Sequence, residues 1–125
     1  MRIAQGDLVL SSTSLAANVT SDPIYLGHIC NYGIQIFFTG TPDGNFKLQL
    51  SNDMGNPQAA DRVNEDYQVT HWTDIAGSTA AVAAAGDLAY NIENAGYRWV
   101  RVVWGADSAG TTPVITSARF NLKGI

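Results

Sequence analysis

The chain has 125 residues, a formal net charge of -4 and only 14% charged residues. This length corresponds to about one domain with a single hydrophobic core, which excludes two stacked domains. Binding to nucleic-acid phosphates needs a local cluster of Lys and Arg, and the closest basic pair in this acidic chain is Arg98 and Arg101. We therefore expect no nucleic-acid partner.

The low share of charged residues is unusual for a small domain. A free domain of this size carries about a quarter charged residues. Here Lys47 and Lys123 are the only lysines, and Glu65 and Glu93 are the only glutamates. We infer that part of the surface faces protein rather than water.

Cysteine content and the amino-terminal segment bear on stability and location. Cys30 is the only cysteine, so no internal disulfide forms and packing must stabilise the fold. Residues 1–7 lack the apolar run of a secretory signal, and no apolar stretch approaches the roughly 20 residues of a membrane-spanning helix. We expect a protein that is made in the cytoplasm and has no membrane span.

Apolar and polar residues alternate along much of the chain, which is the pattern of β-strands with one buried face. Short strands, each bounded by Gly, Asn, Asp or Pro, are predicted first at residues 8–11, 15–20 and 24–29.

A β-hairpin is predicted next. Residues 34–39 and 46–51 alternate strictly, and the Thr-Pro-Asp-Gly sequence at 41–44 has the composition of a turn. Pro42 presets its own φ, and Gly44 tolerates a positive φ. These signals predict that the two strands pair with each other.

The longest polar stretch follows, over residues 52–66, and predicts an exposed loop. Its oxygen-bearing side chains leave a calcium site open as an alternative to a solvated loop, although their spacing is not that of an EF-hand. A further strand is predicted at 67–75. The oxygen-bearing cluster consists of Asp61, Asn64, Glu65 and Asp66.

The alanine-rich segment 78–86 has two interpretations. Alanine favours helix, and Ser78 and Gly86 are suitable caps for its two ends. So short a helix without a charged face is marginal in water, so we favour an extended segment whose small side chains let another surface come close.

Three strands complete the chain, at residues 88–92, 97–104 and 114–123. The second has bulky apolar residues on both faces, as in a central strand that is covered on both sides. Its inner face is predicted to carry Val100, Val102 and Trp104, and its opposite face Tyr97, Trp99 and Arg101. In the last strand we expect Val114, Thr116, Ala118, Phe120 and Leu122 to share one face.

These elements predict an all-β fold in a single domain over residues 1–125. Eight or nine short strands with polar turns, and no long amphipathic helix, indicate an antiparallel β-sandwich. A jelly roll is the topology that we expect.

No catalytic constellation is visible. His28 and His71 are the only histidines and have no short ligand spacing, so we expect no metal site. The Gly-x-Ser-x-Gly motif and the glycine-rich phosphate loops are absent, and most Asp residues lie in turn contexts. We expect no enzymatic activity and no cofactor.

The aromatic residues Trp72, Tyr97 and Trp99, together with Arg101, are the candidate interface or ligand residues. Burial in the core or in a subunit interface is the favoured use of such side chains. A platform on which sugar rings stack is the alternative.

The succession of residues 32–40, 44–53, 72–75 and 96–102 resembles small virion structural proteins of bacterial viruses, over roughly residues 8–123. The resemblance implies a β-sandwich or jelly-roll module that decorates or cements a capsid, serves as a minor capsid protein, or builds a spike or tail part. It transfers no functional residue. Its implied partners are the major capsid protein or other virion proteins and further copies of the chain, and its implied location is the virion.

Two functions are therefore expected. The first is structural: an oligomer-forming, capsid-associated protein whose weakly charged surface meets neighbours without burying unpaired charge. The second is a receptor- or glycan-binding module of a spike or tail, with a host glycan as partner.

Overall fold

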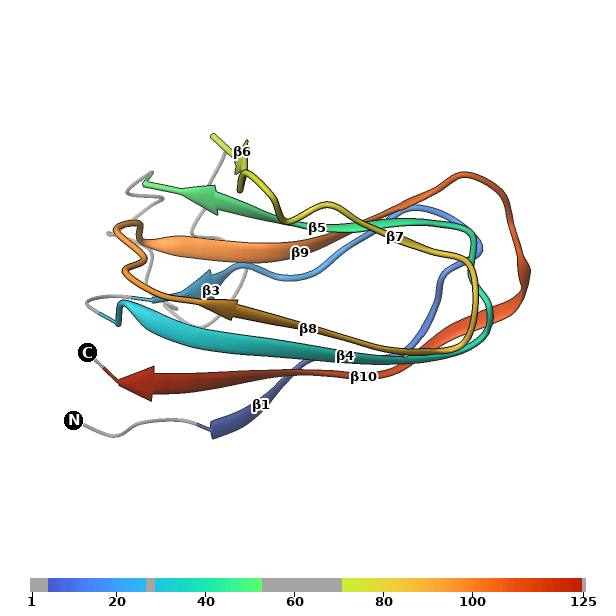
Figure 1. Ribbon diagram of the computed structural model, residues 1–125, viewed down its shortest axis with the longest axis horizontal. Coiled ribbons are helices and arrows are strands. Elements are labelled where there is room, and N and C mark those ends of the chain that lie inside the picture. The colour runs from blue at the N-terminus through green and yellow to red at the C-terminus, as the bar shows by residue number, and fades with distance from the viewer. Residues whose placement is uncertain (1–4, 27–28, 53–70, 125) are drawn as a thin grey trace, which may run out of the picture.

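The computed structural model describes residues 5–26, 29–52 and 71–124, and it is all-β (Figure 1). Among these residues no helix is present that is long and apolar enough to cross a membrane. The strands are β1 (Gln5–Ser14), β2 (Val19–Thr20), β3 (Ile24–Tyr25), β4 (Asn31–Thr41), β5 (Gly44–Ser51), β6 (Thr73–Asp74), β7 (Ala80–Val82), β8 (Gly86–Ile92), β9 (Trp99–Ala106) and β10 (Thr111–Gly124).

Two antiparallel sheets form a β-sandwich, which confirms the expected fold class. Sheet A has the order β1-β10-β4-β8, and sheet B has the order β2-β9-β5-β6, with β3 also paired to β9 and β7 also paired to β5. Because β2 and β3 share one neighbour, and β6 and β7 share another, the ten strands occupy eight positions. The chain crosses between the sheets at nearly every connection, which is the jelly-roll arrangement. Figure 1 shows β5, β9 and β3 in one layer and β8, β4, β10 and β1 in the other.

The predicted hairpin is wrong in its pairing, although both of its strands are present. β4 pairs with β10 and β8 in sheet A, whereas β5 pairs with β9 in sheet B. Pro42 and Asp43 therefore carry the chain across the core rather than around a sheet edge. The rings of Phe38 and Phe46 face each other across the core, with centroids 5.7 Å apart.

The glycines at this connection have roles other than the predicted one. Gly44 does not have a positive φ; it is required because a Cβ there would collide with the backbone oxygen of Gly105. The left-handed conformation belongs instead to Gly40, with φ of 76°, which lies against the backbone of Thr111 and Thr112.

The core lies between the two sheets. Val100, Val102 and Trp104 point into it, as predicted, and each is at most 1% exposed. The indole of Trp104 packs against Phe46 with ring centroids 4.6 Å apart, and its Nε1 donates to the backbone oxygen of Leu15 at 3.0 Å. Among the described residues, every buried side-chain nitrogen and oxygen has a hydrogen-bond partner.

The predicted alternation in the last strand is wrong at its beginning. The pairing of β10 with β4 shifts between Ile115 and Ser117, which indicates a β-bulge. Ile115 is therefore fully buried on the same face as Ala118 and Phe120, while Thr116 is exposed. This shift reverses the faces of Val114 and Ile115 relative to the prediction.

Several early strands are shorter than predicted. Of the predicted strand 15–20 only β2 is extended in a ladder, and of the described residues in the predicted strand 24–29, which are 24–26 and 29, only β3 is. Between them, buried Ser21 continues the contact with β9, because its Oγ accepts a hydrogen bond from Val102 N at 2.9 Å. The predicted strand 67–75 is described only from residue 71, where β6 is its strand part.

The segment 78–86 is extended, as favoured, and contains β7, which pairs with β5. Ser78 caps no helix. Its buried Oγ accepts from Leu48 N at 3.0 Å and donates to the backbone oxygen of Ile75 at 2.7 Å. The hydroxyl of Tyr90 in sheet A donates to the backbone oxygen of Ser78, so this residue links the two layers.

Candidate functional site

Two of the predicted site residues, Trp72 and Arg101, lie together on the outer face of sheet B. Arg101 points away from the core because its neighbours in β9, Val100 and Val102, point inward. Its guanidinium carbon lies 4.2 Å from the centroid of the Trp72 ring, which is a cation–π contact. Both side chains are half-buried.

A line of polar side chains continues from Arg101 across β5 to β6. Arg101 Nε donates to Gln49 Oε1 at 2.8 Å, and Gln49 Nε2 donates to Asp74 Oδ1 at 2.8 Å. Asp74 Oδ2 also pairs with Lys47 Nζ at 3.1 Å. The hydrogen bonds from Gln49 and Lys47 hold the pKa of the exposed Asp74 carboxyl below its usual value. This line of four side chains, Arg101, Gln49, Asp74 and Lys47, is called the polar ladder.

Trp99 also points outward but is covered, with only 3% of its surface exposed. Tyr25, opposite it on β3, covers part of the indole, with ring centroids 4.9 Å apart at an angle of 54°. Tyr25 itself is 56% exposed. The exposed aromatic side chain at this position is therefore a tyrosine that the sequence analysis did not single out.

Tyr97 does not share the outer face, contrary to the prediction. It precedes β9, packs against the core and forms a hydrogen bond of 2.7 Å between its hydroxyl and that of Tyr32. The alternation that would place it beside Trp99 and Arg101 does not extend to it, because β9 begins only at Trp99. Burial raises the pKa of the Tyr97 hydroxyl.

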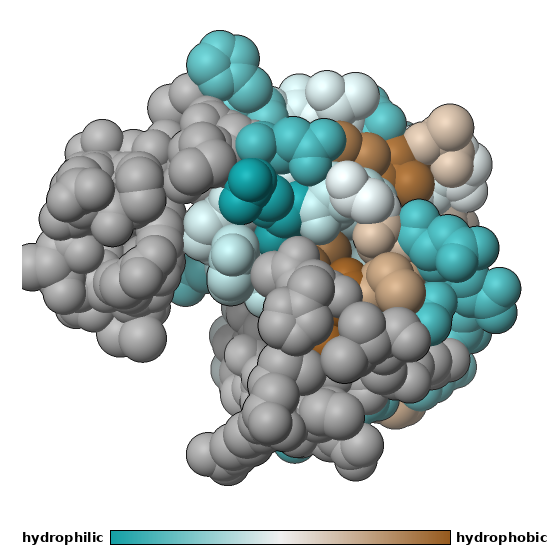
Figure 2. Space-filling view, turned by 90° about the vertical axis from the view of Figure 1, so that its left-hand side faces the viewer, coloured by the Kyte–Doolittle hydropathy of each residue, from teal (hydrophilic) through white to brown (hydrophobic). Residues whose placement is uncertain are grey.

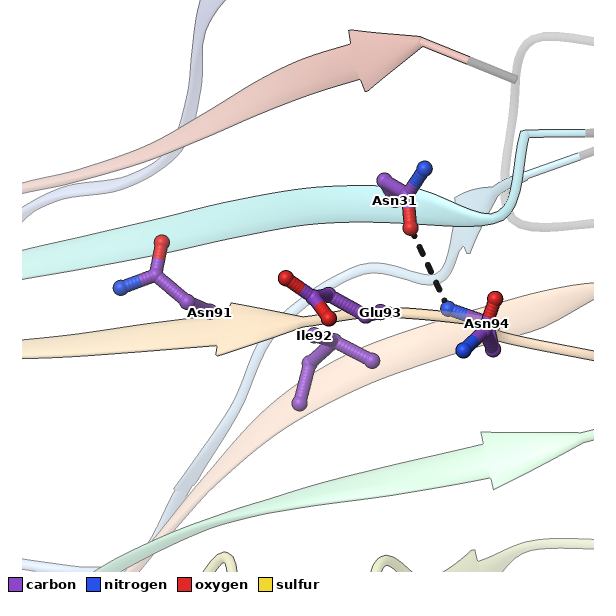
Figure 3. A pocket seen from close by; sticks show the side chains of 5 residues that line it. All are labelled: Asn31, Asn91, Ile92, Glu93 and Asn94. Atoms are coloured by element: carbon purple, nitrogen blue, oxygen red, sulfur yellow. Dashed lines mark hydrogen bonds between the residues drawn. The ribbon is translucent and has the colours of Figure 1, made fainter.

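A recess of about 430 Å³ lies at the end of β8, on the other sheet (Figure 3). Asn94 has a φ of 57°, and its backbone nitrogen donates to Asn31 Oδ1 at 3.2 Å, which holds the Asn31 amide in place. Amide side chains and one carboxylate can donate to and accept from polar ligands, but no basic group contributes to the lining. The lining residues are Asn31, Asn91, Ile92, Glu93 and Asn94.

The described residues contain no group of three or more His, Cys, Asp and Glu side chains that could hold a metal ion. His71 is exposed, and Cys30 is a half-buried free cysteine. His28 and the acidic segment with Asp61, Asn64, Glu65 and Asp66, for which calcium was the open alternative, lie outside the described residues.

The surface around these features mixes hydrophilic and hydrophobic side chains. Figure 2 faces the end of the molecule at which β10 ends, and it shows hydrophobic side chains in small areas between hydrophilic ones. Only two large hydrophobic side chains of the described residues are exposed, Tyr25 on sheet B and Phe37 on sheet A, at 56% and 42%. They lie on opposite outer faces of the sandwich.

Comparison with known proteins gave a match among solved structures and in neither of the other two comparisons. No family model matches the sequence, and no curated protein matches it. Among solved structures, the chain is similar to part of the N-terminal endo-1,4-beta-D-xylanase 10B of Clostridium thermocellum, whose CBM22-1 and GH10 modules were solved in complex with xylohexaose. The TM-score is 0.47 and the identity 14%; the match covers 94% of this chain and 25% of that chain. The chain thus spans a quarter of the length of the protein that it matches.

Proposed function

We propose that the chain is a non-enzymatic structural component of a bacteriophage virion, a capsid-associated decoration, cement or minor capsid protein. It is made in the cytoplasm of the host bacterium and acts by assembly with the major capsid protein, other virion proteins or further copies of itself. The low charge and the resemblance of its sequence to small virion proteins support this function.

The composition of the outer face of sheet A is the observation that supports the proposal. The outward side chains of β4, β8 and β10 form a broad face with Phe37 near its middle, between Asp87 and Ser117 on the neighbouring strands. Asp87 accepts a hydrogen bond from Gln35 Nε2 at 2.8 Å, so its charge already has a partner within the face. This assembly face consists of Gln35, Phe37, Thr39, Asp87, Ala89, Asn91, Thr116, Ser117, Arg119 and Asn121.

Such a face can be covered by protein at low cost. Among the described residues of this face, Asp87 and Arg119 are the charged ones and have opposite signs, so their burial leaves no net charge to compensate. Its Ala, Ser and Thr side chains lose little conformational entropy when a neighbour covers them. An exposed aromatic at the centre of a weakly charged patch is the usual composition of an interface core.

The test is the composition of particles. Mass spectrometry of purified virions should detect the chain in stoichiometric amount with the other structural proteins. A Phe37→Asp variant, which puts a charge at the centre of the assembly face, should be depleted from particles at least tenfold while the purified protein remains folded. Tyr25→Asp, with the same change on the opposite face, is the matched control and should be incorporated normally. Absence of the wild-type chain from mature particles would refute the proposal.

A second candidate function is recognition of a host glycan or receptor, as a module of a spike or tail. The observation that favours it is the exposed ring of Tyr25, which packs against Trp99 on the outer face of sheet B. Carbohydrate stacking requires an exposed ring, so Trp99 and Tyr97 are unsuited to it and Tyr25 takes their place. A glycan array probed with the wild-type chain and with Tyr25→Ala tests this function.

A further inference from the structure

The recess at the end of β8 opens on the same side of the sandwich as the assembly face. Asn31 in β4 and Asn91 in β8 point away from the core, because their strand neighbours Tyr32 and Tyr90 are buried. Asn91 belongs both to the assembly face and to the lining of the recess. A partner that covers this end of the face therefore also covers the recess.

The turn that follows β8 is fixed to the beginning of β4 by two successive hydrogen bonds. Asn94 N donates to Asn31 Oδ1 at 3.2 Å, and Ala95 N donates to the backbone oxygen of Cys30 at 2.8 Å. Asn94 has a φ of 57°, in the left-handed region that asparagine tolerates better than most residues. Although this turn lies outside the ladder, its backbone therefore has one defined position, and so has the recess that it lines.

The recess carries a negative charge. Figure 3 shows the Glu93 carboxylate between the side chains of Asn91 and Asn94. Glu93 is exposed and forms no ion pair with any residue that the structure describes. The other polar side chains of the described lining are amides, which have no formal charge and offer carbonyl oxygens as acceptors.

This composition favours a cation over other ligands. An anion would meet the Glu93 carboxylate without a basic group to bind it. A sugar ring stacks on an aromatic side chain, whereas Ile92 is the apolar residue of the described lining. An ammonium group has three N–H donors and no acceptor, so it can bond to the carboxylate and to amide oxygens at the same time.

Covering the assembly face makes such a cation necessary. A carboxylate that loses its water under a partner without gaining a positive charge destabilises the complex strongly. A lysine side chain of the partner supplies the charge at the end of an apolar stem, which can pack along the neighbouring surface. A second copy of this chain is a poor source, because it has a net charge of -4 and only two lysines, of which Lys47 is paired with Asp74 on the opposite sheet.

We propose that the recess receives a lysine side chain of another virion protein, whose ammonium group pairs with the Glu93 carboxylate. The proposal rests on the proposed structural function and adds the chemistry of the partner at one end of the assembly face. Charge complementarity identifies that partner as a protein with a basic surface, different from this acidic chain.

The experiment is carbodiimide crosslinking of purified particles, which joins a carboxylate to a lysine amine in direct contact with it. Proteolysis and mass spectrometry should then identify a peptide in which Glu93 is joined to a lysine of another virion protein. Glu93→Gln, which keeps the shape of the side chain without its charge, should abolish this crosslink. Asp22→Asn, which removes one negative charge from an exposed position between β2 and β3, is the matched control and should retain it.

Incorporation into particles gives a second measurement. In competition with the wild-type chain, Glu93→Gln should be incorporated about tenfold less, because a charge-assisted hydrogen bond is lost under the partner. Glu93→Asp, which keeps the charge on a shorter side chain, should be intermediate, and Asp22→Asn should be incorporated normally. Glu93 is exposed in the isolated chain, so thermal unfolding of the purified variants should match that of the wild type.

Each other outcome contradicts a stated part. If the wild-type chain is present in particles but Glu93 forms no crosslink, and Glu93→Gln is incorporated normally, the inference is overturned and the proposed function stands. A crosslink from Glu93 to a lysine of a second copy overturns the choice of partner. Depletion of Glu93→Gln without any crosslink in the wild type assigns the cation to an arginine and overturns the lysine. Absence of the wild-type chain from particles overturns the inference and the proposed function together.

Discussion

The hydroxyl groups of Tyr32 and Tyr97 form a hydrogen bond of 2.7 Å at the edge of the core, where Tyr32 is fully buried and Tyr97 only half-buried. Because of this difference in burial, loss of the bond affects the two tyrosines unequally. If Tyr97 loses its hydroxyl, that of Tyr32 has no access to water. If Tyr32 loses its hydroxyl, the hydroxyl of the half-buried Tyr97 still has access to water.

Tyr97→Phe should therefore destabilise the protein by about 1 to 3 kcal/mol, the cost of an unsatisfied buried hydroxyl, and Tyr32→Phe should cost less. In the double variant the second substitution should cost little, because no orphaned hydroxyl remains. Urea unfolding of the four proteins measures the coupling. Additive effects of the two substitutions would show that the bond is absent in solution.

Alkaline pH should destabilise the fold through the buried tyrosines. Burial raises the pKa of Tyr90 from 10.0 to about 12, and it also raises the pKa of Tyr32. In the unfolded chain these groups ionise at about pH 10, so above that pH the unfolded state releases protons that the folded state retains. Stability should be complete below pH 10 and should fall between pH 10 and about 12.

Urea midpoints from neutral pH to about pH 11 measure this loss. Tyr90→Phe should make the dependence shallower. An unchanged slope in Tyr90→Phe would show that the hydroxyl is not protected from ionisation.

Gly44→Ala should be strongly destabilising, because the new Cβ would collide with the backbone oxygen of Gly105 across the sheet. Overpacking of this kind typically costs about 1 to 3 kcal/mol or more. Gly105→Ala is the matched control, since no atom lies within 4 Å of its added Cβ. Thermal unfolding should rank the wild type and Gly105→Ala together and place Gly44→Ala well below them.

Ser78→Ala should cost about 1 to 3 kcal/mol, because it leaves the buried backbone nitrogen of Leu48 without its acceptor. Ser108→Ala removes an exposed hydroxyl that bonds to the side chain of Asp43, where water can replace it. The expected difference between the two variants is measured by chemical denaturation. Equal stabilities would contradict the role of the Ser78 hydroxyl as the acceptor for the buried Leu48 nitrogen.

The inward faces of most strands were predictable from sequence, but the partners of the strands were not. Alternation identifies Ile34, Ile36 and Phe38 as buried whether β4 turns back on its own sheet or leads into the opposite one. A Pro-Asp-Gly turn serves both connections equally well. Only the packing of Phe38 on Phe46 distinguishes them, and that contact is tertiary.

The candidate site, too, could be predicted from the sequence only in part. Trp72 and Arg101 were both named as candidates, but their contact was not predicted, because it joins a residue before β6 to one in β9. Tyr97 was misplaced because a period of two was extended beyond the first residue of β9. Tyr25 was missed because its exposure depends on β3 pairing beside Trp99, a contact between residues far apart in the sequence.

The position of β10 between β1 and β4 has a consequence for synthesis on the ribosome. Residues 111–124 supply the central partner of sheet A, and without them β1 has no neighbouring strand among those described. A nascent chain can therefore close this layer only after β10 has left the exit tunnel. Until then the edges of β1 and β4 are open to pairing with other chains, which makes the interval before β10 emerges the time at which chaperones or early binding partners matter most.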